Sequence, residues 1–271
     1  MFTSILDQVE DLHTVDVSRL HRILCGLFKK IIYKILAYVI DLTPYAVLCL
    51  IAGSASSIFT NRDAILQLLL LVAVIYAVCL IHTYIINGIL IRLAAKLNPI
   101  RFFKKISAAQ AAAFTTQSSV GTLPININCL NTQVGVDEEI ANFTAPLGTT
   151  IGMPGCTAIW PTLLAIFFVN ATGLSWGASD YVMLAVMAVF LSFGSAGVPG
   201  IAVVSAIALF SMLDMPIAAV ILLMPINTIS DMIRTTDNVT SAAVATTIVA
   251  RQEGLLHDEI FDQAEIAEEK L

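Results

Sequence analysis

Five polar residues recur at helical spacing in an otherwise apolar stretch of this sequence. They are Asn227, Asp231, Arg234, Thr235 and Asn238. At about 3.6 residues per turn this spacing places them on one face of a helix, and Asp237 falls off that face. A carboxylate can bind an ammonium group, a guanidinium can hold a carboxylate with two parallel hydrogen bonds, and an amide can donate and accept. This stripe therefore predicts a binding site for a small zwitterionic or anionic solute.

The stripe also has a purely structural interpretation. Asp231 and Arg234 are three positions apart, so they can neutralise each other as a pair that only packs the helix. The functional interpretation is favoured because uncharged hydrogen-bonding groups continue the stripe. In addition, ionisable residues inside a membrane are costly and by default mark functional sites. An intramembrane hydrolase is the weakest alternative, since nothing places a histidine beside Ser118 or a second aspartate beside Asp231.

The composition indicates a membrane protein rather than a soluble enzyme. Apolar residues make up 58% of the chain and charged residues 13%, whereas roughly a quarter of residues are charged in soluble domains. The charged side chains between positions 106 and 250 are Asp137, Glu138, Glu139, Asp180, Asp214, Asp231, Arg234 and Asp237. The cysteines and histidines lack the spacing of zinc sites or disulfide frameworks. We therefore expect no cofactor, no confident metal site and no nucleic-acid partner.

A helix needs about 20 residues to cross a lipid bilayer. Two apolar stretches reach this length, at residues 31–58 and 64–90. A last span is expected at residues 216–250. Lysines and arginines gather before the first span, after the second and at Arg251, which assigns these sides to the cytoplasm. The sequence thus predicts an all-α, multi-pass protein of the plasma (inner) membrane with both termini cytoplasmic.

Three further apolar segments are interrupted by glycine and proline. They are residues 107–129, interrupted at 117–124, residues 140–169, interrupted at 152–155, and residues 181–213, interrupted at 194–200. Helical pieces of about ten residues are too short to cross a bilayer, so the first and last segments are predicted to be re-entrant hairpins. Corresponding broken segments are the best sequence indication of a transporter's binding site.

The interruptions supply further candidate site residues. Ser118 and Ser119 either cap a half-helix or hold a substrate carboxylate together with exposed N–H groups. The backbone at Gly197, Val198 and Gly200 can approach a ligand closely or move as a gate, although a plain structural break would have the same sequence. Cys156 is expected to line the site as a small side chain rather than to act as a reactive thiol. Trp160 and Trp176 are expected to pack.

Four motifs occur in order along the chain and carry a family resemblance. They are residues 117–124 (QSSVGTLP), 146–155 (PLGTTIGMPG), 194–200 (GSAGVPG) and 231–240 (DMIRTTDNVT). With these motifs the chain resembles the dicarboxylate/amino acid:cation symporter family, which has the glutamate-transporter fold, over about residues 31–252. The GMPGC sequence at 152–156 is most similar to the L-cystine uptake branch.

The resemblance implies roles for individual residues. Asp231 matches the family's ligand for the substrate amino group, Arg234 its ligand for a side-chain carboxylate, and Asn238 and Ser119 groups at the substrate's main-chain end. It also implies symport of L-cystine by an elevator-type movement. The alternatives are proton- or sodium-coupled symport of glutamate, aspartate or a C4-dicarboxylate, and a transporter fragment without activity.

Two departures from the family pattern concern the coupling ion and the length. Pro154 offers no side-chain oxygen where sodium-coupled relatives have a ligand, and Asn227 and Ala242 stand where they have aspartates. We predict weakened or absent sodium sites, with H⁺ or Na⁺ as the coupling ion and a residual cation site near Gly148, Gly152 and Asn238.

The family has eight spans, and the match begins near the fifth. The expected parts are a cytoplasmic lead-in (residues 1–30), the fifth and sixth spans (31–105), a transport core (106–252) and an acidic, solvated cytoplasmic tail (253–271). About the first four spans, which hold much of the scaffold of a homotrimer, are expected to be missing.

Overall fold

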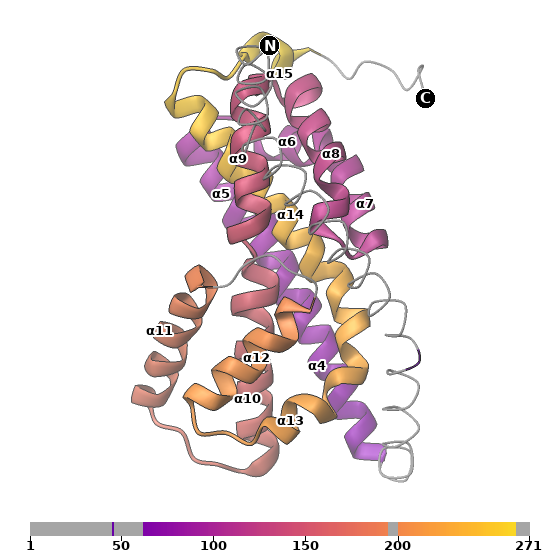
Figure 1. The fold of residues 1–271 in the computed structure, drawn as a ribbon, viewed down its shortest axis with the longest axis vertical. Coiled ribbons are helices and arrows are strands. Elements are labelled where there is room, and N and C mark those ends of the chain that lie inside the picture. The colour runs from indigo at the N-terminus through magenta and orange to yellow at the C-terminus, as the bar shows by residue number, and fades with distance from the viewer. Residues whose placement is uncertain (1–44, 46–61, 195–199, 264–271) are drawn as a thin grey trace, which may run out of the picture. The chain divides into compact units, whose positions relative to one another are not determined.

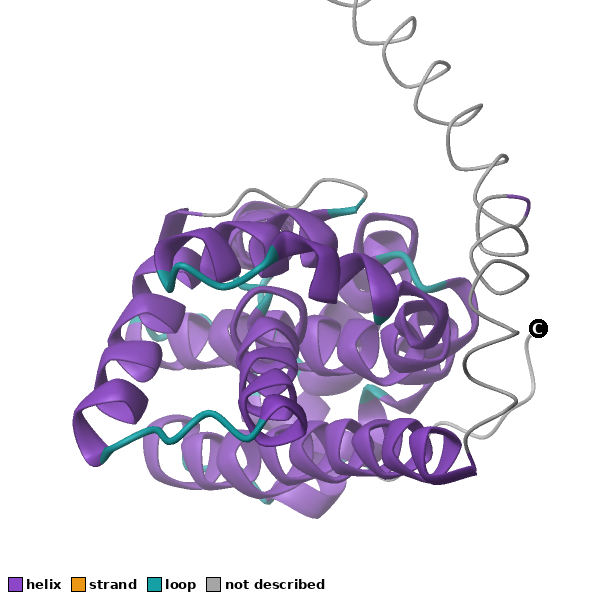
Figure 2. Cartoon of the chain, turned by 90° about the horizontal axis from the view of Figure 1, so that it is seen from below, coloured by secondary structure: helices purple, strands orange, loops and turns teal. Residues whose placement is uncertain are grey.

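The computed structural model describes Tyr45 and residues 62–194 and 200–263. Apart from Tyr45 these residues belong to one compact unit, Leu50–Leu271. The described part of the chain is helical and contains no strand, only an isolated antiparallel bridge between Val136 and Leu256 (Figures 1 and 2). The all-α prediction is confirmed for these residues. The lead-in and the span predicted at 31–58 lie outside them.

The helix predicted at residues 64–90 is present and runs further at both ends. It comprises α4 (Arg62–Leu80), a π-helical stretch η1 (Ile81–Ile86), α5 (Asn87–Leu90) and a second π-helical stretch η2 (Ile91–Ala95). It ends where Lys96 adopts a left-handed φ of 57°. Residues Ile65–Ala95 and Glu138–Thr172 are long and apolar enough to cross a membrane.

After α6 (Pro99–Lys105), the first broken segment forms two helices, α7 (Ser107–Thr116) and α8 (Ser119–Cys129), and a π-helical end η3 (Leu130–Val134). The break falls within the predicted range, but its cause differs from the prediction. Gln117 adopts a left-handed φ of 53°, and the Ser118 hydroxyl accepts the N–H of Gly121 at 3.0 Å as a helix cap. Gly121 and Pro124 lie inside α8 and do not end a helix.

The second broken segment matches its prediction. Helix α9 (Glu138–Ile151) ends at Gly152, whose N–H donates to the carbonyl of Gly148 at 2.7 Å. The chain resumes as the π-helical η4 (Gly155–Ile159) and continues as α10 (Trp160–Thr172). The interruption therefore leaves an unwound stretch in the middle of this span.

The third broken segment consists of α11 (Ala178–Gly194) and α12 (Ile201–Met212). Residues 195–199 between them lie outside the described residues. The single last span predicted at 216–250 is wrong in one respect, because α13 (Ile217–Leu222), a 3₁₀ turn η5 (Met224–Ile226) and α14 (Asn227–Gln252) are separate. Pro225 lies in that turn, and a proline lacks the N–H needed to continue α13.

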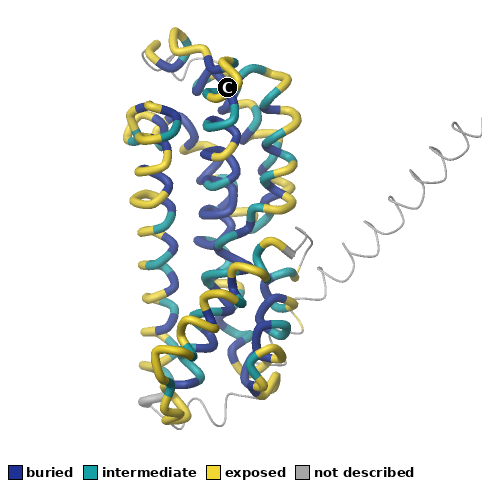
Figure 3. The backbone as a smooth tube through the Cα atoms, turned by 90° about the vertical axis from the view of Figure 1, so that its left-hand side faces the viewer, coloured by how far each residue is buried: buried dark blue, intermediate teal, exposed yellow. Residues whose placement is uncertain are grey.

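Helix α14 lies between two hydrophobic cores. One core includes Ile233 of α14 together with residues of α4, α10, α12 and α13, and its Trp160, Leu209 and Phe210 are fully buried or nearly so. The other surrounds the second half of α14 and involves α7, α8 and α9, with Phe102, Ala113 and Leu130 fully buried. Figure 3 shows buried residues on the inward sides of the helices and exposed residues on the outer sides.

The start of the predicted solvated tail is packed instead of free. Residues 253–263 include α15 (Asp258–Asp262), and Leu256 and Phe261 are only 8% and 4% exposed because they join the second core. Arg251 connects this segment to the preceding helices. Its Nε donates a hydrogen bond to the carbonyl of Ala95 at 2.8 Å, and its Nη1 donates one to Asp258 Oδ2. Residues 264–271 lie outside the described residues.

Candidate functional site

Helix α14 brings the polar stripe together as its spacing predicts. Arg234 is fully buried, and its Nη2 donates to the side-chain oxygen of Asn227 at 2.8 Å and to the carbonyl of Asn227 at 3.0 Å. Its Nε donates to the carbonyl of Ser230 at 3.2 Å. The guanidinium carbon lies 4.2 Å from the centre of the Trp160 ring, which adds a cation–π contact. Trp160 therefore holds the arginine in place, a role beyond the packing predicted for it.

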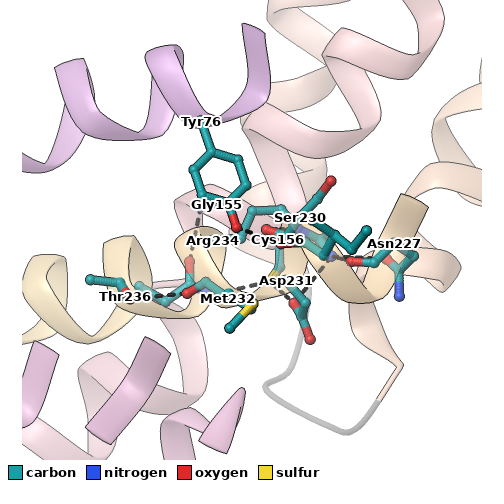
Figure 4. A network of polar contacts seen from close by, with 11 residues as sticks. Tyr76, Gly155, Cys156, Asn227, Ser230, Asp231, Met232, Arg234 and Thr236 are labelled. Carbon is teal, nitrogen blue, oxygen red and sulfur yellow. Dashed lines mark hydrogen bonds and ion pairs between the residues drawn. The ribbon is translucent and has the colours of Figure 1, made fainter. Parts of the chain in front are cut away.

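Asp231 and Arg234 form the ion pair that both interpretations of the stripe allowed. Asp231 Oδ1 lies 3.1 Å from Arg234 Nη2, and the aspartate side chain is 26% exposed whereas the arginine side chain is not exposed at all. Arg234 Nη1 is buried and has no hydrogen-bond partner. A buried cationic donor without a partner is costly, so an acceptor that reaches Nη1 would be bound strongly. Figure 4 shows Asn227, Asp231 and Arg234 along α14.

The unwound stretch of the second broken segment contacts the stripe through Asn238. Its side-chain oxygen accepts the N–H of Gly155 at 2.9 Å, and its Nδ2 lies 3.1 Å from Cys156 Sγ. Cys156 Sγ in turn lies 3.8 Å from Asp231 Oδ1 (Figure 4). Cys156 thus lies between Asn238 and Asp231, and its role in lining a solute site stays a prediction. The two bonds of Asn238 use one N–H and one oxygen lone pair of its amide, which has a second donor and a second lone pair for further bonds.

Glycine is required at position 155 because two backbones meet there. A Cβ atom on Gly155 would lie 2.7 Å from the carbonyl oxygen of Arg234 and 3.0 Å from its Cα. A similar approach occurs further along, where a Cβ on Gly148 would lie 3.2 Å from the Ala242 methyl carbon. Small residues at both positions allow the second broken segment to lie directly on α14.

The remaining candidates are Ser118, Ser119, Thr235 and the residues of the third break. Ser118 caps α8, and Ser119 is 7% exposed in the first turn of that helix. Among the described residues, neither serine is hydrogen-bonded to Asp231 or Arg234. Thr235 is 3% exposed on α14. Gly200 begins α12 with a φ of 82° and has open space around it, while Gly197 and Val198 lie outside the described residues.

The candidate cation site near Gly148, Gly152 and Asn238 has few free ligands. The carbonyl of Gly148 accepts the N–H of Gly152, and the side-chain oxygen of Asn238 accepts that of Gly155. Ala242, which offers no side-chain oxygen, is 1% exposed and packs on Gly148. These residues do not fit a sodium site that depends on a carboxylate at position 242. In residues 62–194 and 200–263 no three His, Cys, Asp or Glu side chains gather as metal ligands.

The sequence reasoning missed a second polar cluster on α14. Asp237 Oδ1 lies 2.7 Å from His82 Nδ1 and accepts the Thr83 hydroxyl at 2.8 Å. The sequence alone gives His82 no partner and places Asp237 only off the stripe. His82 lies in the segment Ile65–Ala95, which is apolar enough to cross a membrane, and an ionisable residue in such a segment was the available signal. The separation of 155 positions between His82 and Asp237 hid the pairing.

Comparison with known proteins agrees with this geometry. Residues 13–252 match the sequence pattern of the sodium:dicarboxylate symporter family. The chain belongs to the sodium:dicarboxylate symporter family. The resemblance predicted from the four motifs is therefore confirmed, and members of this family are transporters rather than enzymes.

The family relatives include cystine transporters. The chain is 34% identical to the L-cystine uptake protein TcyP of Bacillus cereus over 258 residues, which are 92% of this chain and 54% of that protein. It is 36% identical to an uncharacterized symporter of Haemophilus influenzae over 224 residues, 82% of this chain and 50% of that protein. The L-cystine uptake protein TcyP of Shouchella clausii is 35% identical over 232 residues, which are 85% of this chain and 49% of that protein. This symporter-family chain spans about half the length of the curated relatives it matches.

Proposed function

We propose that this chain forms the solute-binding part of a symporter for L-cystine in the plasma (inner) membrane. The observation that carries the proposal is the Asp231–Arg234 pair beside the unwound stretch, with Arg234 Nη1 buried and unpartnered. L-cystine has two amino acid ends, so it offers an ammonium group for the aspartate and carboxylates for the guanidinium. The relatives named for L-cystine uptake support this choice.

The same geometry defines what binding must change. Arg234 is not exposed, and Asp231 is 26% exposed. A carboxylate can reach Nη1 only if the cover over the arginine opens, and the second hairpin, predicted at residues 181–213, is the proposed gate. We further propose that the two hairpins move with α9, α10 and α14 as an elevator against a scaffold, and that the complete assembly is a homotrimer within the lipid bilayer.

The alternative solutes are glutamate, aspartate and C4-dicarboxylates, which the family description favours. These compounds place a single second carboxylate on Arg234, but a C4-dicarboxylate has no ammonium group for Asp231. Selectivity between such dicarboxylates and the three amino acids therefore depends on whether Asp231 binds an amine or only neutralises the arginine.

The test measures the thermal stability of the purified chain in lipid nanodiscs with L-cystine, L-glutamate, L-aspartate or succinate, each with and without sodium. A ligand that binds only the folded state raises the melting temperature, and a free concentration of about 100 times Kd stabilises by about 2.7 kcal/mol. We expect L-cystine to give the largest shift, with little dependence on sodium. Succinate giving the larger shift would favour the alternative, and no shift with any solute would contradict the proposed function.

A further inference from the structure

An open groove runs along the outer face of the span that contains η1, α5 and η2. It has a volume of about 390 Å³ and is lined by residues between Tyr84 and Leu93 and by Pro99 of α6. Among the described residues that line it, Arg92 carries the only charge. Ile89 and Leu93 are 52% and 72% exposed. The groove is separate from the solute site, because none of these lining residues belongs to η4 or α14.

The floor of the groove lies where α6 packs on the span, in the upper half of Figure 1. Gly88 is buried there, and a Cβ atom on it would lie 3.5 Å from Cε2 of Phe103 and 3.6 Å from Cβ of Pro99. Tyr84 packs edge-on against the same Phe103, with ring centroids 5.1 Å apart. The missing side chain at position 88 therefore leaves a depression beside an aromatic pair, and a flexible hydrocarbon chain fits this shape.

The groove has a charged end and an apolar end. Arg92 lies three residues, or about 4.5 Å, before the end of the membrane-length segment Ile65–Ala95. An arginine near the end of a spanning helix extends its guanidinium to the headgroup layer. Tyr84 lies eight residues, or about 12 Å, further toward the middle of the span. A matching ligand has a polar group at one end and a hydrocarbon chain at the other, as a phospholipid has.

The charges around Arg92 determine the sign of that ligand. Residues 91–105 contain five basic residues and no acidic one. Arg101 pairs with Asp262 at 3.4 Å. The side chains of Arg92 and Lys96, in contrast, form no hydrogen bond or ion pair with any residue that the structure describes. A guanidinium binds phosphate through two parallel hydrogen bonds, and basic residues next to a span attract anionic lipids.

We propose that this groove binds one anionic phospholipid, with the phosphate on Arg92 and an acyl chain that lies over Gly88 toward Tyr84. The inference rests on the proposed function only for the placement of the span in a membrane. A zwitterionic phospholipid has the same chains but no net charge for Arg92 and Lys96, so it binds more weakly. The bound lipid fills the depression between the span and α6, and so stabilises the packing of α6, which leads into the first broken segment.

The test is native mass spectrometry of the full chain in detergent micelles with phosphatidylglycerol or phosphatidylcholine of the same acyl chains. We expect one phosphatidylglycerol to stay bound at concentrations where phosphatidylcholine does not. Arg92→Gln should weaken this binding by about fivefold, the effect of one cation beside an anionic headgroup. Arg101→Gln is the matched control, because Arg101 already has a carboxylate partner. Equal binding of the two lipids, or equal losses in the two variants, would indicate general attraction to a basic surface and would overturn the inference.

Two further measurements test the groove itself. Gly88→Leu places a side chain where the acyl chain is proposed to lie and should reduce binding of phosphatidylglycerol. Glycerol phosphate, which has no acyl chain, should not compete with the lipid at equal concentration. Competition by glycerol phosphate would indicate a site for small anions, and a dimer that Gly88→Leu dissociates would indicate a second copy in the groove; either result would overturn the inference. If Gly88→Leu fails to fold, Arg92→Gln and the competition measurement decide it.

The lipid measurements need no solute, so they separate this inference from the proposed function. The thermal shift with L-cystine should be the same in Arg92→Gln as in the unmodified chain, because Arg92 lies outside the solute site. A chain that holds phosphatidylglycerol in the predicted way but binds no solute contradicts the proposed function and supports the lipid site. A chain that binds L-cystine but shows no preference for phosphatidylglycerol overturns the lipid site and leaves the proposed function in place.

Discussion

Two aspartates of α14 lie six positions apart and have opposite surroundings. Asp231 is partly exposed, lies beside the unwound stretch and pairs with the buried guanidinium of Arg234 on its own helix. Asp237 has no exposure, lies against η1 and contacts His82 and Thr83 of that stretch. One helix therefore holds one aspartate by a contact within the helix and the other by contacts to a neighbouring helix.

The largest effect is expected from breaking the Asp231–Arg234 pair. Arg234→Ala leaves Asp231 without its counter-charge, and removing one partner of a buried ion pair costs about 3–5 kcal/mol. We expect L-cystine binding to be lost and the melting temperature to fall. Arg234→Met, which keeps more of the side-chain volume, should also lose binding. Arg101→Ala removes an exposed arginine and should change neither quantity; retained binding in Arg234→Met would refute the assignment of this residue.

The next largest effect should come from the backbone contact beneath that pair. A methyl group at position 155 would lie 2.7 Å from the Arg234 carbonyl oxygen, so Gly155→Ala must push η4 away from α14. We expect a loss of about 1–3 kcal/mol in stability and weaker solute binding, measured by denaturation and thermal shift. Gly177→Ala is the matched control, since its Cβ would make only ordinary contacts at 3.8 Å. Equal stabilities of the two variants would contradict the close approach.

An effect of similar size is expected at Asn238, which holds the unwound stretch on α14. Asn238→Ala removes the acceptor for the buried N–H of Gly155, and an unsatisfied buried group costs about 1–3 kcal/mol. Amide hydrogen exchange at residues 155 and 156 should become faster, because the unwound stretch loses its tether. Asn170→Ala removes an exposed hydrogen bond, which the Asn170 side-chain amide donates to the carbonyl of Ile166. This control should leave both exchange and stability unchanged. Unaltered exchange in Asn238→Ala would argue against this tether.

The smallest effect concerns Asp258, an exposed aspartate of α15. The hydrogen bond from Arg251 lowers the pKa of Asp258, so its stabilisation is present above the ordinary aspartate value of about 3.9 and is lost as the pH falls below it. The side chain is 58% exposed, which limits the contribution to less than about 1 kcal/mol. Asp258→Asn should lower the melting temperature slightly at neutral pH and not in acid. An equal difference at both pH values would contradict the ion pair.

Local patterns in the sequence predicted the polar stripe and the positions of the helix breaks. The stripe could be predicted because helical periodicity acts within a few residues, and the break at Gly152–Gly155 because glycine and proline weaken any helix. The break at Gln117 was assigned to the wrong residues, since a left-handed glutamine followed by a serine cap carries a weaker signal than Gly121 or Pro124.

Tertiary contacts were harder to predict than local structure. The pairing of His82 with Asp237 and the contact of Trp160 with Arg234 depend on which helices become neighbours. The burial of Leu256 and Phe261 in the supposed tail has the same origin, because the second core forms from segments far apart in the chain.

The π-helical stretches η1 and η2 limit how this protein can be redesigned. A π-helical turn holds one residue more than an α-helical turn, so it changes the rotational phase of everything that follows. His82 and Thr83 lie within the first stretch and Asn87, which donates to Ser241 of α14, lies directly after it. Deleting a single residue there would turn Asn87 away from Ser241 by roughly a quarter of a turn. A regular α-helix designed from periodicity alone would therefore present the wrong face to α14.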